Sequence, residues 1–166
     1  MYIPFDQIDF EARVWIYQAN RPLTHDEVGT LTETLKAALD EWEAHGQKLT
    51  ASGKVFHNRF IVIAVDEDKA LPSGCSIDKS VHWLQEIGPR LGVDFFDRSL
   101  MYLDDRNELQ SIPVSGIKKA IASEALFPDT TVFDNTVTTK AQWMKRWKVK
   151  AENTWLKRYF STEQAS

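Results

Sequence analysis

Apolar side chains recur every three or four positions in two stretches of the chain, which predicts two amphipathic helices. The first stretch follows Thr24, and Glu27 stands three residues later, the spacing of a capping box that begins a helix. Gly46 comes after this stretch and is expected to end the helix in a left-handed conformation. Ser76 is the expected N-cap of the second helix. The apolar positions are Val28, Leu31, Leu35, Leu39 and Trp42 in the first stretch, and Ile77, Val81, Leu84, Ile87 and Leu91 in the second.

Five short segments are rich in β-branched and aromatic residues, a pattern typical of strands. Residues 60–65 are apolar at every position, so we expect this strand to be buried on both faces of a sheet. A turn at Asn58 and Arg59 precedes it, and a turn at Asp104 and Asp105 predicts a second hairpin. The expected strands are 13–18, 54–57, 60–65, 99–103 and 108–112.

The order of these elements is strand, helix, strand, strand, helix, strand, which predicts an α+β fold. This is the order of a ferredoxin-like split βαβ core, in which an antiparallel sheet carries its two main helices on one face. We expect a single domain over residues 1–166, with this core at about 13–112. Residues 113–166 are expected to form an appendage: a short helix at 113–122, a strand at 132–133 and a helix at 140–147 that Thr138 or Thr139 caps.

The composition is that of an ordinary globular protein, with 166 residues, 43% hydrophobic and 27% charged. The longest wholly apolar run is six residues, far short of the roughly 20 that cross a bilayer, so we expect no membrane insertion. The opening residues show no secretory signal. One cysteine, Cys75, excludes an internal disulfide and a multi-cysteine zinc site. Together these features predict a cytoplasmic protein.

Nucleotide hydrolysis is suggested by the apolar strand at 60–65, because Asp66 and Glu67 follow it as they would in a Walker B strand. Such a site also needs a phosphate loop with four residues between its glycines and Ser or Thr after its lysine. The nearest string runs from Gly46 to Gly53, Lys54 and Val55, with six residues between the glycines and valine after the lysine. We therefore expect no ATP hydrolysis.

Cys75 is a candidate nucleophile because a thiol near a helix N-terminus meets free amides and the positive end of the helix dipole. His57 and Asp66 are the expected neighbours that would complete such a catalytic site. The alternative is a buried structural cysteine. The four histidines lack metal-ligand spacing, so we expect neither a metal nor a cofactor.

Charge is distributed unevenly. Residues 140–166 hold seven basic and two acidic side chains, whereas the rest of the chain holds 13 basic and 22 acidic ones. Cations alternate with large aromatic residues in this segment, which suits a protein partner or single-stranded nucleic acid. The segment could instead dock on its own acidic body or on a second copy. A pI near 5.6 makes nucleic acid the less favoured partner. The candidate contacts are Trp143, Lys145, Arg146, Trp147, Lys157 and Arg158.

Five segments also carry a resemblance to known sequences: Val-Trp-Ile-Tyr-Gln at 14–18, Ala-Val-Asp-Glu-Asp at 64–68, Ser-Gly-Cys-Ser-Ile-Asp at 73–78, Phe-Asp-Arg at 96–98 and Trp-Leu-Lys-Arg-Tyr-Phe at 155–160. They resemble a short, uncharacterised bacterial family whose members often carry the label ABC transporter ATPase. The resemblance spans nearly the whole chain and implies no catalytic residues. The chain lacks both the Walker A loop and the Leu-Ser-Gly-Gly-Gln signature of ABC ATPases.

These observations predict a cytoplasmic binding or interaction domain with no complete catalytic constellation. A small thiol-dependent enzyme or sensor that uses Cys75 is one alternative. A single-stranded nucleic-acid binder that uses the basic-aromatic segment is the other.

Overall fold

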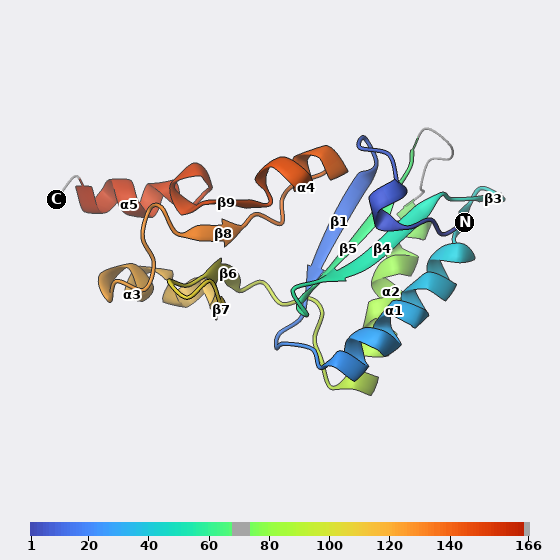
Figure 1. Ribbon diagram of the computed structural model, residues 1–166, viewed down its shortest axis with the longest axis horizontal. Helices are drawn as coiled ribbons and strands as arrows, with labels where there is room; N and C mark the ends of the chain where they lie inside the picture. The colour runs from blue at the N-terminus through green and yellow to red at the C-terminus, as the bar shows by residue number, and fades with distance from the viewer. Residues whose placement is uncertain (68–73, 165–166) are drawn as a thin grey trace. The chain divides into compact units, whose positions relative to one another are not determined.

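The computed structural model describes residues 1–67 and 74–164, and the side chains of 74–78 and 161–164 lie outside that description (Figure 1). Helices and antiparallel strands are mixed along the chain, which confirms the α+β class. The chain divides into two compact units. Unit 1 comprises Met1–Asp97 and Thr136–Trp143, and unit 2 comprises Arg98–Asn135 and Met144–Ser166. The expected boundary between core and appendage near residue 112 falls inside unit 2 of this division.

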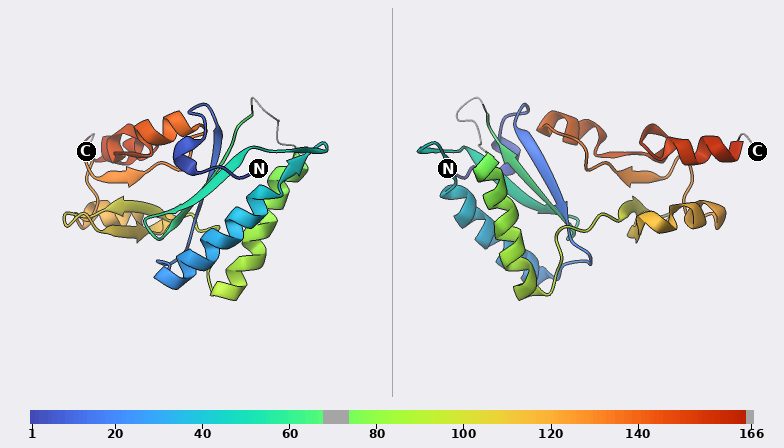
Figure 2. Two further views of the ribbon diagram at one scale, coloured as in Figure 1. Left: turned by 45° about the vertical axis from the view of Figure 1, so that its right-hand side comes forward. Right: turned by 180° about the vertical axis from the view of Figure 1, so that it is seen from behind.

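Unit 1 is built on a three-stranded antiparallel sheet of β1 (Arg13–Gln18), β5 (Phe60–Val65) and β4 (Ala51–Phe56), in the order β1-β5-β4. The two long helices, α1 (His25–Asp40) and α2 (Gly74–Leu91), lie on one face of it (Figures 1 and 2). The buried side chains between them include Leu31, Leu35, Leu39, Ile61, Ile63 and Leu84.

The other face of this sheet is covered as well. The 3-10 helix η1 (Phe5–Gln7) and the returning segment 136–143 place Phe5, Ile8, Val137 and Trp143 against Val62 and Ala64. Every residue of β5 is therefore buried, as its unbroken apolar sequence predicts.

The start of α1 confirms the predicted capping box. Thr24 accepts a hydrogen bond from the Glu27 N–H, and the Glu27 carboxylate accepts one from the Thr24 N–H. The prediction that Gly46 ends this helix is wrong, because α1 ends at Asp40. His45 and Gly46, with φ of 53° and 78°, form the turn between two short strands, β2 (Glu43–Ala44) and β3 (Gln47–Lys48). A tight hairpin turn needs positive φ at its central residues, which is the use this glycine serves.

Helix α2 runs through Pro89 to Leu91, and Leu84 and Ile87 are buried, as its period predicts. The expected cap at Ser76 and the apolar contact of Ile77 lie outside the described side chains. The helix ends against Val93, whose N–H donates to the Gly88 carbonyl oxygen at 2.9 Å.

Unit 2 holds a second antiparallel sheet in the order β7-β6-β8-β9. Its strands are β6 (Leu100–Leu103), β7 (Leu109–Ile112), β8 (Thr131–Phe133) and β9 (Lys148–Lys150). The helices α3 (Ile117–Ala122) and α5 (Lys157–Gln164) and the 3-10 turns η2 (Val114–Gly116) and η3 (Ala151–Asn153) complete the unit. Leu100, Ile117, Leu126 and Leu156 lie in its core.

The strand expected to be the fourth of a ferredoxin-like sheet is β6, and it pairs in unit 2 instead. Two irregular segments hold the outer edge of β1. Gln18 exchanges backbone hydrogen bonds with Phe95 and Asp97, and the Val14 N–H donates to the Thr138 carbonyl oxygen. Because these segments already hydrogen-bond this edge at both ends, β6 pairs with β7 and β8.

The later elements match their predictions in kind. Helix α4 (Lys140–Arg146) begins behind Thr139, whose hydroxyl accepts from the Gln142 N–H at 3.1 Å, so Thr139 is the cap. Trp147 stands just past the helix and is buried in unit 2. Among the described residues, no helix is both long enough and apolar enough to span a membrane.

Candidate binding pocket

The structure does not bring His57 and Asp66 together. His57 is exposed in the turn that joins β4 to β5, whereas Asp66 follows the far end of β5 and is buried. Six strand residues separate the two positions at about 3.3 Å each, so they lie roughly 20 Å apart. A site that combines both side chains is therefore not formed. The side chain of Cys75 lies outside the described residues.

The glycine-rich string compared above with a phosphate loop also has a different structure. Gly46 lies in the β2–β3 turn, and Gly53 and Lys54 lie inside β4. A phosphate loop needs free backbone amides ahead of a helix. In β4, this string instead pairs with β5.

Two tryptophans of the basic-aromatic segment, Trp143 and Trp147, are packing residues. The Trp147 ring is 3% exposed, its Nε1 donates to the Asn135 Oδ1 at 2.9 Å, and it packs edge-on against Phe133. Trp143 contacts the rings of Phe5 and Phe56 in unit 1. These two rings thus pack on the protein itself, Trp143 in unit 1 and Trp147 in unit 2.

The four cations of the same segment that were expected to contact a partner lie at the surface. Lys145, Arg146, Lys157 and Arg158 are all exposed. The Arg158 guanidinium lies over the ring of Tyr159, 5.0 Å from its centroid. These four residues lie in unit 2, whereas Trp143 lies in unit 1.

Unit 2 contains a depression of about 590 Å³. Its walls are formed by the end of β6, the turn after it, the residues after α3 and the approach to β8. The pairing of β6 with β8, through Tyr102 and Val132, holds these walls together. The depression is lined by Tyr102, Leu103, Asp104, Asp105, Asn107, Glu124, Ala125, Phe127, Asp129, Thr130 and Thr131.

Four of these lining residues are carboxylates, and none is a lysine, arginine or histidine. Asp104 is held by its own turn. Its Oδ1 accepts from the N–H groups of Glu108 and Arg106, each at 2.9 Å, and its Oδ2 accepts from Gln110 Nε2 at 3.1 Å. These hydrogen bonds, led by that from Glu108, lower the pKa of Asp104. The pocket is therefore strongly anionic at neutral pH.

Glu124, Asp105 and Asp129 make up the rest of this anionic lining. All three are exposed, and the described part of the chain places no cation within ion-pair distance of them. The turn after β6 supplies Asp105, and the segment between α3 and β8 supplies Glu124 and Asp129. Each carboxylate can accept hydrogen bonds from a bound donor.

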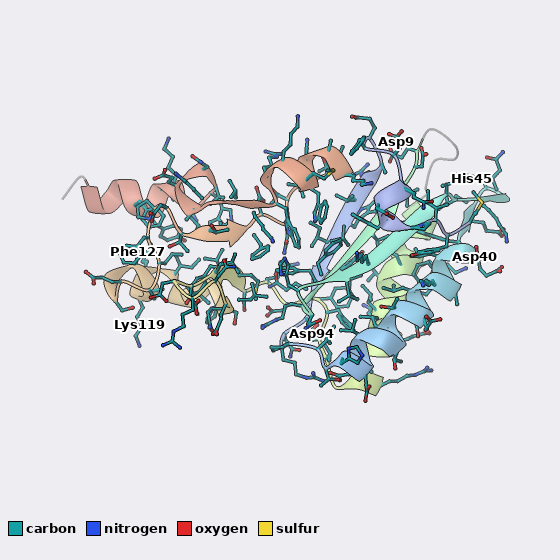
Figure 3. All side chains as sticks on the ribbon, in the orientation of Figure 1. Asp9, Asp40, His45, Asp94, Lys119 and Phe127 are labelled. Carbon is teal, nitrogen blue, oxygen red and sulfur yellow. The ribbon has the colours of Figure 1, made fainter. Side chains whose placement is uncertain are left out.

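Two aromatic rings accompany the carboxylates. Tyr102 is half-buried on β6, and Phe127 is 48% exposed on the segment between α3 and β8, where Figure 3 labels it. The Phe127 N–H donates to the Thr130 hydroxyl at 2.9 Å, which fixes this turn. Carboxylates and aromatic faces in one depression favour a cation that also offers apolar surface.

A bare metal ion is a poor match for the same residues. No described group of three or more acidic, histidine or cysteine side chains is arranged to hold a metal. The four carboxylates come from two segments of the lining, which suits a larger cation with several donors.

The sequence alone does not predict this pocket. Asp104 and Asp105 are recognisable as a turn, and Glu124 and Asp129 as loop residues, but no spacing rule links the two pairs. Only the strand pairing reveals that they share a pocket. Comparison of the chain with protein-family models, with curated proteins and with solved structures found no match.

Proposed function

We propose that the protein is a binding module that takes an organic cation, an amine or a guanidinium, in the depression of unit 2. The single observation that carries this proposal is a lining of four carboxylates and two aromatic rings with no basic residue. The carboxylates would accept hydrogen bonds from the cation, and Phe127 would cover its apolar part. No covalent step is part of this function.

Spermidine and N-acetyl-arginine amide test the proposal as probes, with uncharged N-acetyl-citrulline amide as the control ligand. We expect saturable binding of at least one cationic probe by calorimetry and no binding of N-acetyl-citrulline amide. Glu124→Gln and Asp129→Asn should each weaken binding by roughly twofold to fivefold, because an exposed charge pair contributes up to about 1 kcal/mol. Glu33→Gln, an exposed position on α1, is the matched control and should bind as the parent does.

Two results would overturn the proposal. One is the absence of saturable binding of both probes in the millimolar range by folded protein. The other is equal binding by the parent and by a variant that carries both pocket substitutions.

We propose three further points that the sequence suggested. A cytoplasmic location is supported by the single cysteine, and the absence of ATP hydrolysis is supported by the strand conformation of Gly53 and Lys54. Unit 1 is best understood as a ferredoxin-like core that retains three strands, a view supported by its order β1-β5-β4 and by its two helices on one face.

A further inference from the structure

Strand β9 is an outer strand of the sheet in unit 2. It pairs with β8 through Thr131 and Lys150, Val132 and Val149, and Phe133 and Lys148. Its other side pairs with no strand in residues 1–67 and 74–164. An open edge of this kind can accept another extended segment.

The hydrogen bonds between β8 and β9 show which backbone groups of β9 face its unpaired side. The Asp134 N–H donates to the Trp147 carbonyl oxygen at 2.7 Å, and the Ala151 N–H donates to the Thr130 carbonyl oxygen at 2.9 Å. Alternate residues of an antiparallel strand bond to the same neighbour, so the backbone of Val149 also faces β8. Lys148 and Lys150 consequently direct their N–H groups away from β8, and no described residue accepts from them.

The side chains of the strand select the charge of an incoming segment. Lys148 and Lys150 are exposed and lie on one face of the sheet, about 7 Å apart, because strand residues alternate between faces. Val149 points to the other face and packs on the core of unit 2. A segment added at this edge would meet two cations on one face.

A second copy of β9 is a poor occupant. Antiparallel pairing of two β9 strands about Val149 would set Lys148 directly opposite Lys150 twice, and like charges in that position destabilise the pair. An extended segment with Asp or Glu two residues apart places an opposite charge beside each lysine. Charge complementarity thus identifies an acidic partner.

We propose that β9 is a docking edge for an acidic, extended segment of a partner protein, which adds to the sheet as a fifth strand. Its backbone would bond to the outward groups of Lys148 and Lys150, and its two carboxylates would pair with their ammonium groups. No residue of β9 lines the anionic pocket, and neither proposal depends on the other.

The probe is a capped peptide, acetyl-Val-Glu-Val-Glu-Val-amide, with Gln and Lys versions in place of Glu. In amide hydrogen exchange, we expect the N–H groups of Lys148 and Lys150 to exchange readily in the free protein and to slow with the Glu peptide. The Val149 N–H should be protected throughout. The Gln peptide should bind roughly twofold to thirtyfold more weakly, because it lacks two cross-strand charge pairs.

Charge reversal provides the matched comparison. The double variant Lys148→Glu, Lys150→Glu should no longer bind the Glu peptide and should bind the Lys peptide. Lys118→Glu with Lys119→Glu makes the same change in charge on α3 of the same unit and should leave Glu-peptide binding unchanged. Glu124→Gln, in the pocket, should also leave it unchanged, which separates this test from the previous one.

Three outcomes would overturn the proposal. In the first, the Glu peptide slows the hydrogen exchange of neither amide. The lysines would then serve only to prevent other strands from pairing with this edge. In the second, the Glu and Lys peptides bind equally to the parent. In the third, an oligothymidylate probe binds at Lys148 and Lys150 with a steep salt dependence while the Glu peptide does not, which would make the surface a nucleic-acid site.

Discussion

Arg21 and Glu27 are joined by two parallel hydrogen bonds, from Nη1 to Oε1 and from Nη2 to Oε2, each 2.8 Å long. The same guanidinium donates to the Leu91 carbonyl oxygen at 2.7 Å, and the same carboxylate accepts from the Thr24 N–H at 2.9 Å. One ion pair therefore ties the first turn of α1 to the last residue of α2. Planar, bidentate pairs of this kind are the geometry in which arginine differs most from lysine.

This ion pair predicts how stability depends on pH. The hydrogen bonds from Arg21, followed by that from the Thr24 N–H, lower the pKa of Glu27 from 4.5 to about 2. Because the folded-state pKa lies below the unfolded one, the carboxylate stabilises the fold above about pH 4.5, and this contribution is lost as the pH falls toward 2. Glu27→Gln should flatten the decline in urea midpoint between pH 5 and pH 2. Glu33→Gln should keep the parent slope, and equal slopes for parent and Glu27→Gln would contradict the prediction.

Two glycines in helices predict opposite effects of the same substitution. A Cβ at Gly88 would stand 2.6 Å from the Val93 carbonyl oxygen, whereas a Cβ at Gly29 would meet nothing within 4 Å. Gly88→Ala should lower the free energy of unfolding by about 1–3 kcal/mol, because the end of α2 must shift. Gly29→Ala should raise it by up to about 1 kcal/mol, because alanine favours the helix. Urea unfolding measures both, and a stable Gly88→Ala variant would show that this contact is loose.

A buried hydroxyl without a hydrogen-bond partner predicts a substitution that does not lower the free energy of unfolding. The Ser52 Oγ in β4 has no hydrogen-bond partner in the described structure, and the residue is fully buried. Ser52→Ala should leave the free energy of unfolding unchanged or raise it by about 1–2 kcal/mol, because an unsatisfied polar group is removed. Ser80 is equally buried, and its hydroxyl lies 3.5 Å from that of Tyr17. Ser80→Ala should therefore be destabilising, and the reverse order of the two variants would contradict this account.

The two environments of tryptophan in unit 2 predict a large and a small effect. Trp147→Ala should lower the free energy of unfolding by about 3–5 kcal/mol, because it removes a buried ring and its bond to Asn135. Trp155 is 47% exposed, so Trp155→Ala should change it by about 0.5 kcal/mol or less. Circular dichroism during urea unfolding measures both. Similar losses in the two variants would show that Trp155 also supports the core.

Local signals were sufficient for most individual elements. The range of β1, the start of α1 and the burial of β5 follow from residue types within a few positions, and the structure confirms them. The pairing of β6 did not follow from such signals. The irregular segments that hold the edge of β1 carry no strand pattern, so nothing in the sequence marks that edge as occupied.

The candidate sites show the same limit. His57 and Asp66 are near in sequence, but the hairpin sets them at opposite ends of a strand. Asp104 and Asp129 are far apart in sequence, but the pairing of β6 with β8 brings them to one depression. The sequence showed which residue types could form a site. Which of these residues lie close together depended on strand pairing.

The return of residues 136–143 to unit 1 has a consequence for synthesis on the ribosome. Residues 98–135 of unit 2 leave the ribosome before this segment does. The Thr138 carbonyl, which bonds to β1, and the Trp143 ring, which covers the sheet face, therefore emerge late. While most of its neighbour is translated, unit 1 therefore has only its N-terminal residues, such as Phe5 and Ile8, to cover this face of the sheet. A nascent chain stalled before residue 136 would expose this apolar face, and chaperones that bind such surfaces would have their longest access to the protein in that interval.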